Sequence, residues 1–262
     1  RYVNFPPTAD SLIRVNLDKA IIHKGDAFDV STLEQERNRI TDLFRNNGYY
    51  YYQNNDASYL ADTTLTYGLA SMRLQMADSV SNRVLRKWDI GTITINLQRQ
   101  FMDSLSRQSR FRDIIVNYNG SHKPLRLRTI TNDLKIWPGT VYNNELVEKT
   151  QQQLNSSGVF AATNFAFTPR DTTDTCSILD MTINCVFDKP YDFYIEAYGK
   201  GKTSGRYGPE AIVGLTKRNV FRGGEKFDLR LHGSYEWSAS SDDDGRDRLG
   251  LNNYEYGAEA SL

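Results

Sequence analysis

The sequence is short of the residues that build disulfide frameworks and metal sites, since its 262 residues include only 2 cysteines and 3 histidines. It has no apolar run that approaches the roughly 18 residues of a transmembrane helix. It also has no excess charge of either sign, because 32 Lys and Arg balance 32 Asp and Glu. This balance argues against a nucleic-acid-binding protein and against a polybasic membrane-surface protein. With 39% hydrophobic and 24% charged residues, the chain is expected to fold rather than remain disordered.

The two cysteines are not expected to form a disulfide. Cys176 and Cys185 fall in one predicted strand, residues 176–187, where extended backbone separates them by roughly 30 Å. A disulfide needs Cα atoms within about 7 Å of each other. Apolar residues alternate along this strand, so Cys185 is predicted to lie in a core. The histidines have no partner at zinc-ligand spacing, and no metal site is expected.

Residues 1–188 contain a loose internal repeat. Each copy has a glycine followed three residues later by an aromatic residue, then a helical pattern, and then a second glycine followed by aromatic residues. The glycines and the aromatic residues that follow them are Gly25, Phe28, Gly48 and Tyr49 in copy one, and Gly139, Tyr142, Gly158 and Phe160 in copy two. The repeat predicts two domains of similar fold.

The pattern within each copy predicts strand, helix, helix, strand and strand, a two-layer α+β unit. In copy one, Ser31 and Glu34 suggest a capping box at the start of a helix. The other expected helices are residues 8–22 and 125–136, with a further helix starting at Asn143. The expected strands are residues 49–53, 71–76, 92–97, 159–168 and 176–187, and residues 113–119 are interpreted as an extension of strand 92–97.

This order of elements, with its glycine and aromatic punctuation, resembles the POTRA (polypeptide-transport-associated) domain. Residues 33–52 are similar to POTRA segments of BamA/TamA-like proteins. The resemblance implies a POTRA-like domain at residues 1–86, with part of its first strand missing, and a second at residues 87–188.

A different pattern occupies residues 189–262, where four segments of about ten residues alternate between apolar and polar side chains. Such segments have the length and periodicity of membrane-spanning β-strands. A half-solvated soluble sheet also alternates, but charged polar faces and aromatic strand ends favour a membrane-spanning sheet. The residues expected to face lipid are Phe227, Leu229, Leu231, Tyr235 and Trp237.

Residues 215–237 resemble the start of an Omp85-superfamily barrel, in which a strand ends in an Asn-aromatic-Gly-Gly turn and a long strand follows. The resemblance implies an α+β chain of two POTRA-like domains followed, at residues 189–262, by the first antiparallel strands of an incomplete transmembrane β-barrel. Four strands leave open edges, and the chain begins at Arg1 without a methionine. The chain is therefore interpreted as a fragment.

Enzyme motifs are weak in this sequence. Gly201-Lys202-Thr203 lacks the upstream glycine of a phosphate-binding loop, because position 196 is Glu. The acidic run at residues 242–244 lacks the twelfth-position carboxylate of a calcium loop, where Leu251 stands. No GxSxG nucleophile motif occurs. We therefore expect a protein that is not an enzyme and has no cofactor.

The resemblance implies an outer-membrane protein assembly and insertion factor with its POTRA domains in the periplasm. Its partners would be unfolded outer-membrane proteins, accessory assembly proteins and outer-membrane lipid, and not nucleic acid. Strands 93–97 or 176–187 are the expected POTRA edges for client β-augmentation. The first barrel strand is expected to pair with a client strand through Tyr191, Phe193, Ile195, Ala197 and Gly199. The alternatives are a two-partner-secretion transporter of the same superfamily and a barrel fused to an enzyme domain outside this chain.

Overall fold

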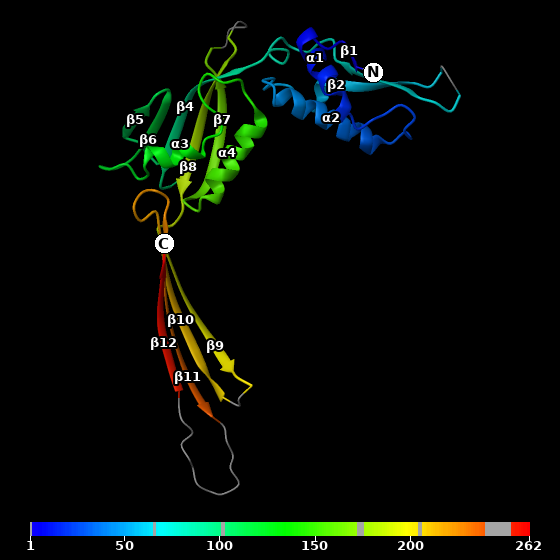
Figure 1. Cartoon of the computed structure of the whole chain (residues 1–262). Coiled ribbons are helices and arrows are strands. Elements are labelled where there is room, and N and C mark those ends of the chain that lie inside the picture. Colours follow the sequence, from blue (N-terminus) through cyan, green and yellow to red (C-terminus); the bar gives the residue numbers. More distant parts are fainter. Residues whose placement is uncertain (1, 65–66, 101–102, 172–175, 204–205, 239–252) are drawn as a thin grey trace, which may run out of the picture.

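The computed structural model describes residues 2–64, 67–100, 103–171, 176–203, 206–238 and 253–262. In this part of the chain the strands form three sheets, all of them open. Figure 1 shows two units in which helices accompany a sheet, and a third sheet that extends away from them. We call residues 2–76 unit one, residues 89–187 unit two and residues 191–261 the terminal sheet.

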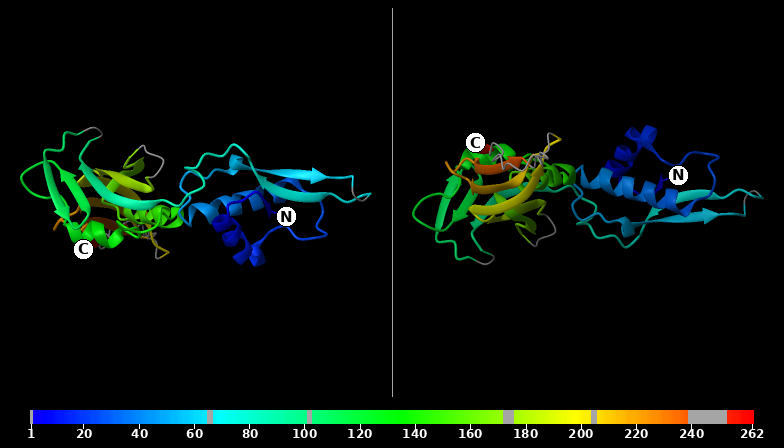
Figure 2. Two further views of the ribbon diagram at one scale, coloured as in Figure 1. Left: turned by 90° about the horizontal axis from the view of Figure 1, so that it is seen from above. Right: turned by 90° about the horizontal axis from the view of Figure 1, so that it is seen from below.

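Unit one is a two-layer α+β unit. Its elements are β1 (Tyr2–Val3), α1 (Pro7–Val15), the 3-10 helix η1 (Leu17–Lys19), α2 (Val30–Arg45), the 3-10 helix η2 (Asn54–Asp56), β2 (Ala57–Asp62) and β3 (Ser71–Met76). The described strands have the order β1-β3-β2, with β1 parallel and β2 antiparallel to β3. The helices lie on one side of this sheet (Figure 2). Ile13, Ile40, Phe44 and Leu74 are buried between the two layers.

Two helix boundaries in unit one differ from the sequence prediction. The capping box at Ser31 and Glu34 is wrong, because Asp29 is the N-cap and its carboxylate accepts from the backbone N–H of Ser31 and Thr32 at 3.2 and 3.0 Å. The helix predicted for residues 8–22 ends at Val15. Asn16 leaves helical geometry there, and its side-chain amide bonds the carbonyl oxygen of Leu12 at 3.0 Å.

The strand predicted at residues 49–53 is also wrong. The backbone turns here instead, with the N–H of Tyr50 bonded to the oxygen of Gly48 at 2.9 Å and that of Tyr52 bonded to Tyr49 at 3.1 Å. The aromatic residues are present for packing, since Tyr49 and Tyr52 are buried in the core of unit one. The strand starts later, at Ala57, in a segment that the sequence suggests is a loop. The predicted strand at residues 71–76 is confirmed as β3.

Unit two repeats this architecture with an insertion. Its elements are β4 (Asp89–Gln98), β5 (Arg107–Phe111), β6 (Ile114–Tyr118), α3 (Leu127–Asp133), α4 (Asn144–Ser156), β7 (Phe160–Pro169) and β8 (Ile178–Phe187). The described strands have the order β5-β6-β4-β8-β7. β4 is parallel to β8, and β7 is antiparallel to β8, as in unit one. The predicted β-α-α-β-β order is confirmed in both units, and the hairpin β5–β6 is an addition to it.

This hairpin corrects two predictions. Residues 113–119 do not extend the first strand, because β6 is a separate strand that pairs parallel with β4. Strands 93–97 and 176–187 were expected to offer a free edge, but β4 lies between β6 and β8, and β8 lies between β4 and β7. The free edges of this sheet in the described chain are β5 and β7.

The remaining corrections in unit two concern element ends. The helix predicted at residues 125–136 ends at Asp133, because Leu134 is buried in extended conformation and the N–H of Lys135 bonds the hydroxyl of Thr150 at 3.0 Å. Cys176 precedes β8 rather than lying within it. Both cysteines are free thiols, and Cys185 is fully buried, as predicted.

The terminal sheet consists of β9 (Tyr191–Gly201), β10 (Arg206–Arg218), β11 (Lys226–Ser238) and β12 (Asn253–Ser261). All neighbours in it are antiparallel, in the order β12-β11-β10-β9 among the described strands. The four predicted alternating segments are therefore confirmed as strands. The acidic run at residues 242–244 lies outside the described residues.

Units one and two interlock through the segment that follows α2. The ring of Tyr50 lies 5.0 Å from that of Tyr142, and the ring of Tyr51 lies 5.2 Å from that of Trp88. Gly48 has a φ of 101°, and a β-carbon there would press on the side chain of Val141. Its carbonyl oxygen accepts from the N–H of Trp88 at 2.8 Å. Aromatic residues of unit one thus complete the core of unit two.

Candidate functional site

The edge strands of the terminal sheet in the described chain are β9 and β12, and β9 is the strand that the sequence predicts to pair with a client. β10 pairs with its inner side from Tyr191 to Gly201, and no described strand pairs with its outer side. An unpaired strand edge offers a row of N–H and C=O groups to another extended chain. Tyr191, Phe193, Ile195, Ala197 and Gly199 all lie on this edge strand, on one face of the sheet.

That face is apolar across the four strands. The register aligns Ile195 with Val213, Val213 with Leu231, and Leu231 with Ala258. The adjacent row is Phe193, Leu215, Leu229 and Ala260. Ile195 is 66% exposed and Leu231 is 48% exposed. No described helix lies against the terminal sheet (Figure 1). The two rows therefore form an uncovered apolar surface.

Aromatic residues mark both ends of this surface. Tyr191 and Phe227 lie at the end near unit two, aligned through Lys217. At the far end, the rings of Tyr235 and Trp237 lie 6.0 Å apart, and Tyr254 is opposite Tyr235. From the Tyr191 row to the Gly199 row the strand advances about 26 Å. Transmembrane barrel walls carry an apolar band roughly 25 Å tall between two aromatic girdles.

The opposite face of the terminal sheet is polar and paired. Lys202 lies 2.6 Å from Glu236, and Lys226 lies 3.1 Å from Asp228. The guanidinium of Arg230 donates to the hydroxyl of Tyr194 at 3.2 Å and lies 3.8 Å from Glu259. Apart from Lys217 on the apolar face and Ile212 on the polar face, the two faces differ in character, which matches the parity predicted from the sequence.

The turn between β10 and β11 rests on unit two. The Nδ2 of Asn219 donates to the carbonyl oxygen of Pro124 at 2.8 Å, and the N–H of Arg126 donates to the oxygen of Arg222 at 2.8 Å. Beside the turn, Arg218 lies 3.4 Å from Asp188 and 2.6 Å from Asp192. We call the contact of residues 219–225 with unit two the turn seat. Asn219 and Arg222 have positive φ angles of 56° and 64°.

The sequence predicts an Asn-aromatic-Gly-Gly turn at this point, but it does not predict the contact of the turn with unit two. The only local signal is Asn219, an asparagine where the backbone turns left-handed. Its partner Pro124 is distant in sequence, so the contact becomes apparent only in the fold. The end of β9 at Gly201 and the end of β11 at Ser238 lie at the other end of the terminal sheet from the turn seat.

An asparagine row crosses the open face of the sheet of unit two. The Nδ2 of Asn117 donates to Oδ1 of Asn96 at 2.9 Å, and the Nδ2 of Asn96 donates to Oδ1 of Asn184 at 2.7 Å. The register continues the row to Gln108 on β5 and to Asn164 on β7. The row thus runs from one free edge to the other with polar side chains.

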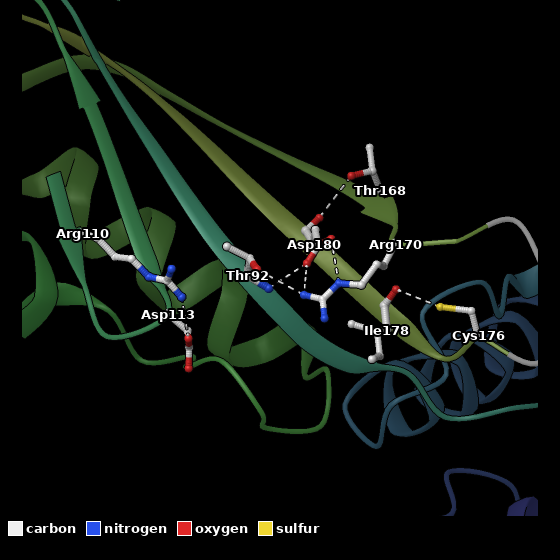
Figure 3. A network of polar contacts seen from close by, with 8 residues as sticks. All are labelled: Thr92, Arg110, Asp113, Thr168, Arg170, Cys176, Ile178 and Asp180. Carbon is white, nitrogen blue, oxygen red and sulfur yellow. Dashed lines mark hydrogen bonds and ion pairs between the residues drawn. The ribbon is translucent and has the colours of Figure 1, made fainter. Parts of the chain in front are cut away.

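Figure 3 shows the other polar network of this sheet, which is built around Asp180. β4 carries one extra residue opposite Asp180, and the N–H of Thr92 donates to Oδ1 of Asp180 at 2.7 Å. Arg170 donates to the same oxygen at 2.7 Å. Burial raises the pKa of Asp180, but the hydrogen bonds from Arg170 and Thr92 outweigh it and hold this pKa below its ordinary value. The network stabilises a β-bulge and has no feature of a reactive site.

Within the described ranges, no group of three or more His, Cys, Asp or Glu residues is arranged to hold a metal ion. Among the helices of the described residues, none is both long and apolar enough to cross a membrane.

Comparison with protein-family models gave no match, and comparison with curated protein sequences gave none either. Among solved structures, the chain is similar to BamA from Haemophilus ducreyi lacking POTRA domains 1–3, with a TM-score of 0.51 and 10% identity. The similarity covers 98% of this chain and 45% of that one, so the chain spans less than half the length of this BamA.

Two further structures are similar at lower TM-scores. POTRA3–5 of Haemophilus influenzae BamA gives 0.42 at 13% identity, over 71% of this chain and 59% of that one. CdiB from Acinetobacter baumannii gives 0.41 at 11% identity, over 90% and 39%. The similarity to the Haemophilus ducreyi protein is a likeness of fold. The chain has the fold expected from its resemblance to the Omp85 superfamily, POTRA-like units followed by the first strands of a barrel.

Proposed function

We propose that this protein assembles outer-membrane β-barrel proteins, with units one and two in the periplasm and the terminal sheet in the outer membrane. The observation that carries the proposal is the unpaired edge of β9 beside a continuous apolar face. Within this proposal, residues 1–86, 87–188 and 189–262 are the three domains, and each contains one of the three described sheets.

The membrane location is supported by the two faces of the terminal sheet. Exposed aliphatic side chains such as Ile195 and Leu231 are costly in water and favourable in lipid. The spacing of the aromatic ends is close to the height of an apolar barrel wall. In this arrangement Phe227, Leu229, Leu231, Tyr235 and Trp237 face lipid, and the charged face lines a wet interior.

Client capture in this proposal is β-augmentation. An unfolded barrel protein presents extended segments whose backbone groups need partners before they enter lipid. The free edges of units one and two bind such a segment, and β9 then pairs with a client strand along Tyr191, Phe193, Ile195, Ala197 and Gly199. Gly199 and Gly201 weaken pairing at the far end of β9, which favours exchange of partners. The process forms and breaks hydrogen bonds only, so it requires neither a catalytic residue nor a cofactor.

The test is proline substitution in β9, in cells that depend on this protein. Successive N–H groups of a strand point to opposite sides, so Ile195→Pro and Glu196→Pro together remove one donor toward β10 and one from the free edge. We expect the variant that loses the outward donor to lower the amount of folded outer-membrane proteins severalfold. Ile195→Val keeps the N–H and serves as the matched control. Wild-type levels of outer-membrane proteins in both proline variants would refute the role of β9.

A further inference from the structure

The edge strand β5 lies beside a pocket that the fold does not fill. The pocket has a volume of about 330 Å3 and lies between the end of β5 and helix α3. Its lining residues are Phe111, Arg112, Leu127, Arg128, Thr131, Asn132 and Trp137. This volume is at the small end of the roughly 300–1,000 Å3 range of ligand pockets. A pocket of this volume can hold one large side chain together with parts of the residues next to it.

The pocket lies on the helix side of the sheet, where alternate residues of an added strand would point. Phe111 pairs with Ile114, and Ser109 pairs with Val116, and both partners are buried in the core. Ser109 and Phe111 therefore share the helix-facing side of β5. A strand that pairs with the outer side of β5 places every second side chain on that same side, about 4.8 Å further out. One of these side chains would meet the pocket.

The lining has two kinds of chemistry. Phe111, Leu127 and Trp137 form apolar walls, and Phe111 is 40% exposed. Arg112 and Arg128 are exposed at the pocket, and neither has an ion-pair partner among the described residues. Of the two other arginines of this hairpin, Arg110 is on the opposite face and pairs with Asp113 at 3.3 Å, and Arg107 is on the helix-facing side with Ser109 and Phe111. The pocket side thus has uncompensated positive charge beside an apolar surface.

The second free edge of this sheet is less accessible. On β7, the carbonyl oxygen of Thr163 accepts from the side-chain amide of Gln151 on α4 at 3.3 Å. β7 also ends in Pro169, which has no N–H to donate. No such side-chain contact occupies the outer side of β5 among the described residues. The β5 edge is therefore the better template for an added strand.

We propose that β5 and this pocket bind an extended peptide strand, which places a large apolar side chain between Phe111, Leu127 and Trp137 and a carboxylate beside Arg112 and Arg128. Backbone pairing with β5 supplies affinity, and the pocket selects the side chains. The carboxylate belongs either to an acidic side chain or to the end of the peptide chain. This inference rests on the proposed function, because it names which edge captures a client and what the client carries.

The probe is a fluorescein-labelled ten-residue peptide of alternating valine and threonine with phenylalanine at its end, measured by fluorescence anisotropy with the full chain in detergent. One form has a free terminal carboxylate, a second is amidated, and a third is amidated with glutamate before the phenylalanine. We expect one or both carboxylate forms to bind about three- to tenfold more tightly than the neutral amidated form. The form that binds tightly identifies the source of the carboxylate.

The variant Arg112→Asn/Arg128→Gln should abolish this preference. Asn tolerates the left-handed φ of 54° at position 112, and Arg128 is exposed, so both replacements preserve the fold. The matched control is Arg110→Gln, which removes a positive charge from the same hairpin on the other face and should keep the preference. If all three peptides bind wild type and the double variant alike, the pocket is not the site, although capture at another edge stands. If none of the peptides binds, both the site and capture by unit two are wrong.

Discussion

Asn219 joins the terminal sheet to unit two, because its Nδ2 donates to the carbonyl oxygen of Pro124 at 2.8 Å. Its Oδ1 also accepts from the N–H of Gly224 at 3.2 Å, so one side chain both shapes the turn and fastens it. The second bond across this contact, from the N–H of Arg126 to Arg222, has the same length. The N–H of Arg126 is therefore a direct reporter of whether the turn is seated.

Asn219→Gly should loosen the turn seat without straining the backbone, because glycine accepts the positive φ at this position. Loss of a hydrogen bond with a net contribution of about 1 kcal/mol should speed hydrogen exchange of the Arg126 amide roughly fivefold. Asn4→Gly, at another asparagine with positive φ, is the control and should leave the Arg126 amide unchanged. Unchanged exchange in Asn219→Gly would show that the seat does not depend on this side chain.

Leu231→Lys should impair integration into the membrane, because a lysine on the lipid side near the middle of a barrel wall costs about 2–4 kcal/mol. Leu231 lies in the central rows of the apolar face. His232→Lys, one residue further on the polar face, should integrate normally. Carbonate extraction of membranes measures both variants. Equal retention of the two would contradict the assignment of the faces.

Gly91→Ala should destabilise unit two, because a β-carbon there would overlap the side chains of Asp180 and Ile178 at the bulge. Overpacking of this kind costs about 1–3 kcal/mol. Gly233→Ala is the control, since a β-carbon at Gly233 has no neighbour within 4 Å. Urea unfolding followed by tryptophan emission reads the core of unit two through Trp88 and Trp137 when both variants also carry Trp237→Phe, which removes the tryptophan of the terminal sheet. A midpoint for Gly91→Ala as high as that of Gly233→Ala would count against the packing argument.

Glu36→Gln should destabilise unit one. Glu36 is 1% exposed and accepts from the hydroxyl of Tyr2 at 2.7 Å, from the N–H of Ile21 at 2.9 Å and from Arg39 at 2.6 and 2.8 Å. Weakening a buried ion pair by changing one partner costs about 3 kcal/mol. Glu34→Gln changes a carboxylate whose side chain is 46% exposed and whose partner is Arg37, so it should cost less than about 1 kcal/mol. Hydrogen exchange of the α2 amides distinguishes the two variants.

The same carboxylate gives unit one a pH dependence. Burial raises the pKa of Glu36, but hydrogen bonds from Arg39, Ile21 and Tyr2 outweigh burial and hold the pKa below its ordinary value. Its contribution to stability is therefore complete above the unfolded pKa of about 4.3 and is lost as the pH falls through the lower folded value. The protection factors of the α2 amides, which are exchange rates relative to those of an unfolded chain at the same pH, should fall in this acid range in wild type. In Glu36→Gln this fall should be smaller.

The terminal sheet could be predicted strand by strand because its side chains sort by a single rule. Phe227, Leu229 and Leu231 alternate with charged residues, and no covering helix disturbs that parity. The order of elements in units one and two could also be predicted, because Gly48 and Gly158 mark the ends of helices in the sequence. Their φ angles in the structure are 101° and 68°. These features depend on neighbours in sequence.

The features that could not be predicted depend on distant partners. β5 has the sequence Arg-Gln-Ser-Arg-Phe, which lacks apolar alternation because the strand is an exposed edge. Since the strand could not be predicted, the pocket between it and α3 could not be predicted either. The aromatic run at residues 49–52 has the composition of a strand, but its rings pack in two different cores. Tyr49 and Tyr52 pack in unit one and Tyr50 and Tyr51 pack against unit two, and the backbone forms a turn that allows both. The N-cap of α2 is Asp29 rather than the predicted Ser31, because the carboxylate of Asp29 accepts from the first backbone N–H groups of the helix.

The rings of Tyr50 and Tyr51 have a mechanical consequence. Both residues belong to unit one by their position in the chain, but their rings pack against Tyr142 and Trp88 in the core of unit two. The two units are therefore joined by packed side chains as well as by the chain itself. A change in the position of unit one relative to unit two must therefore displace side chains packed on the core of unit two. Asn219 and Arg222 connect unit two in turn to the strand pair β10–β11, so packed or hydrogen-bonded contacts join all three parts of the chain.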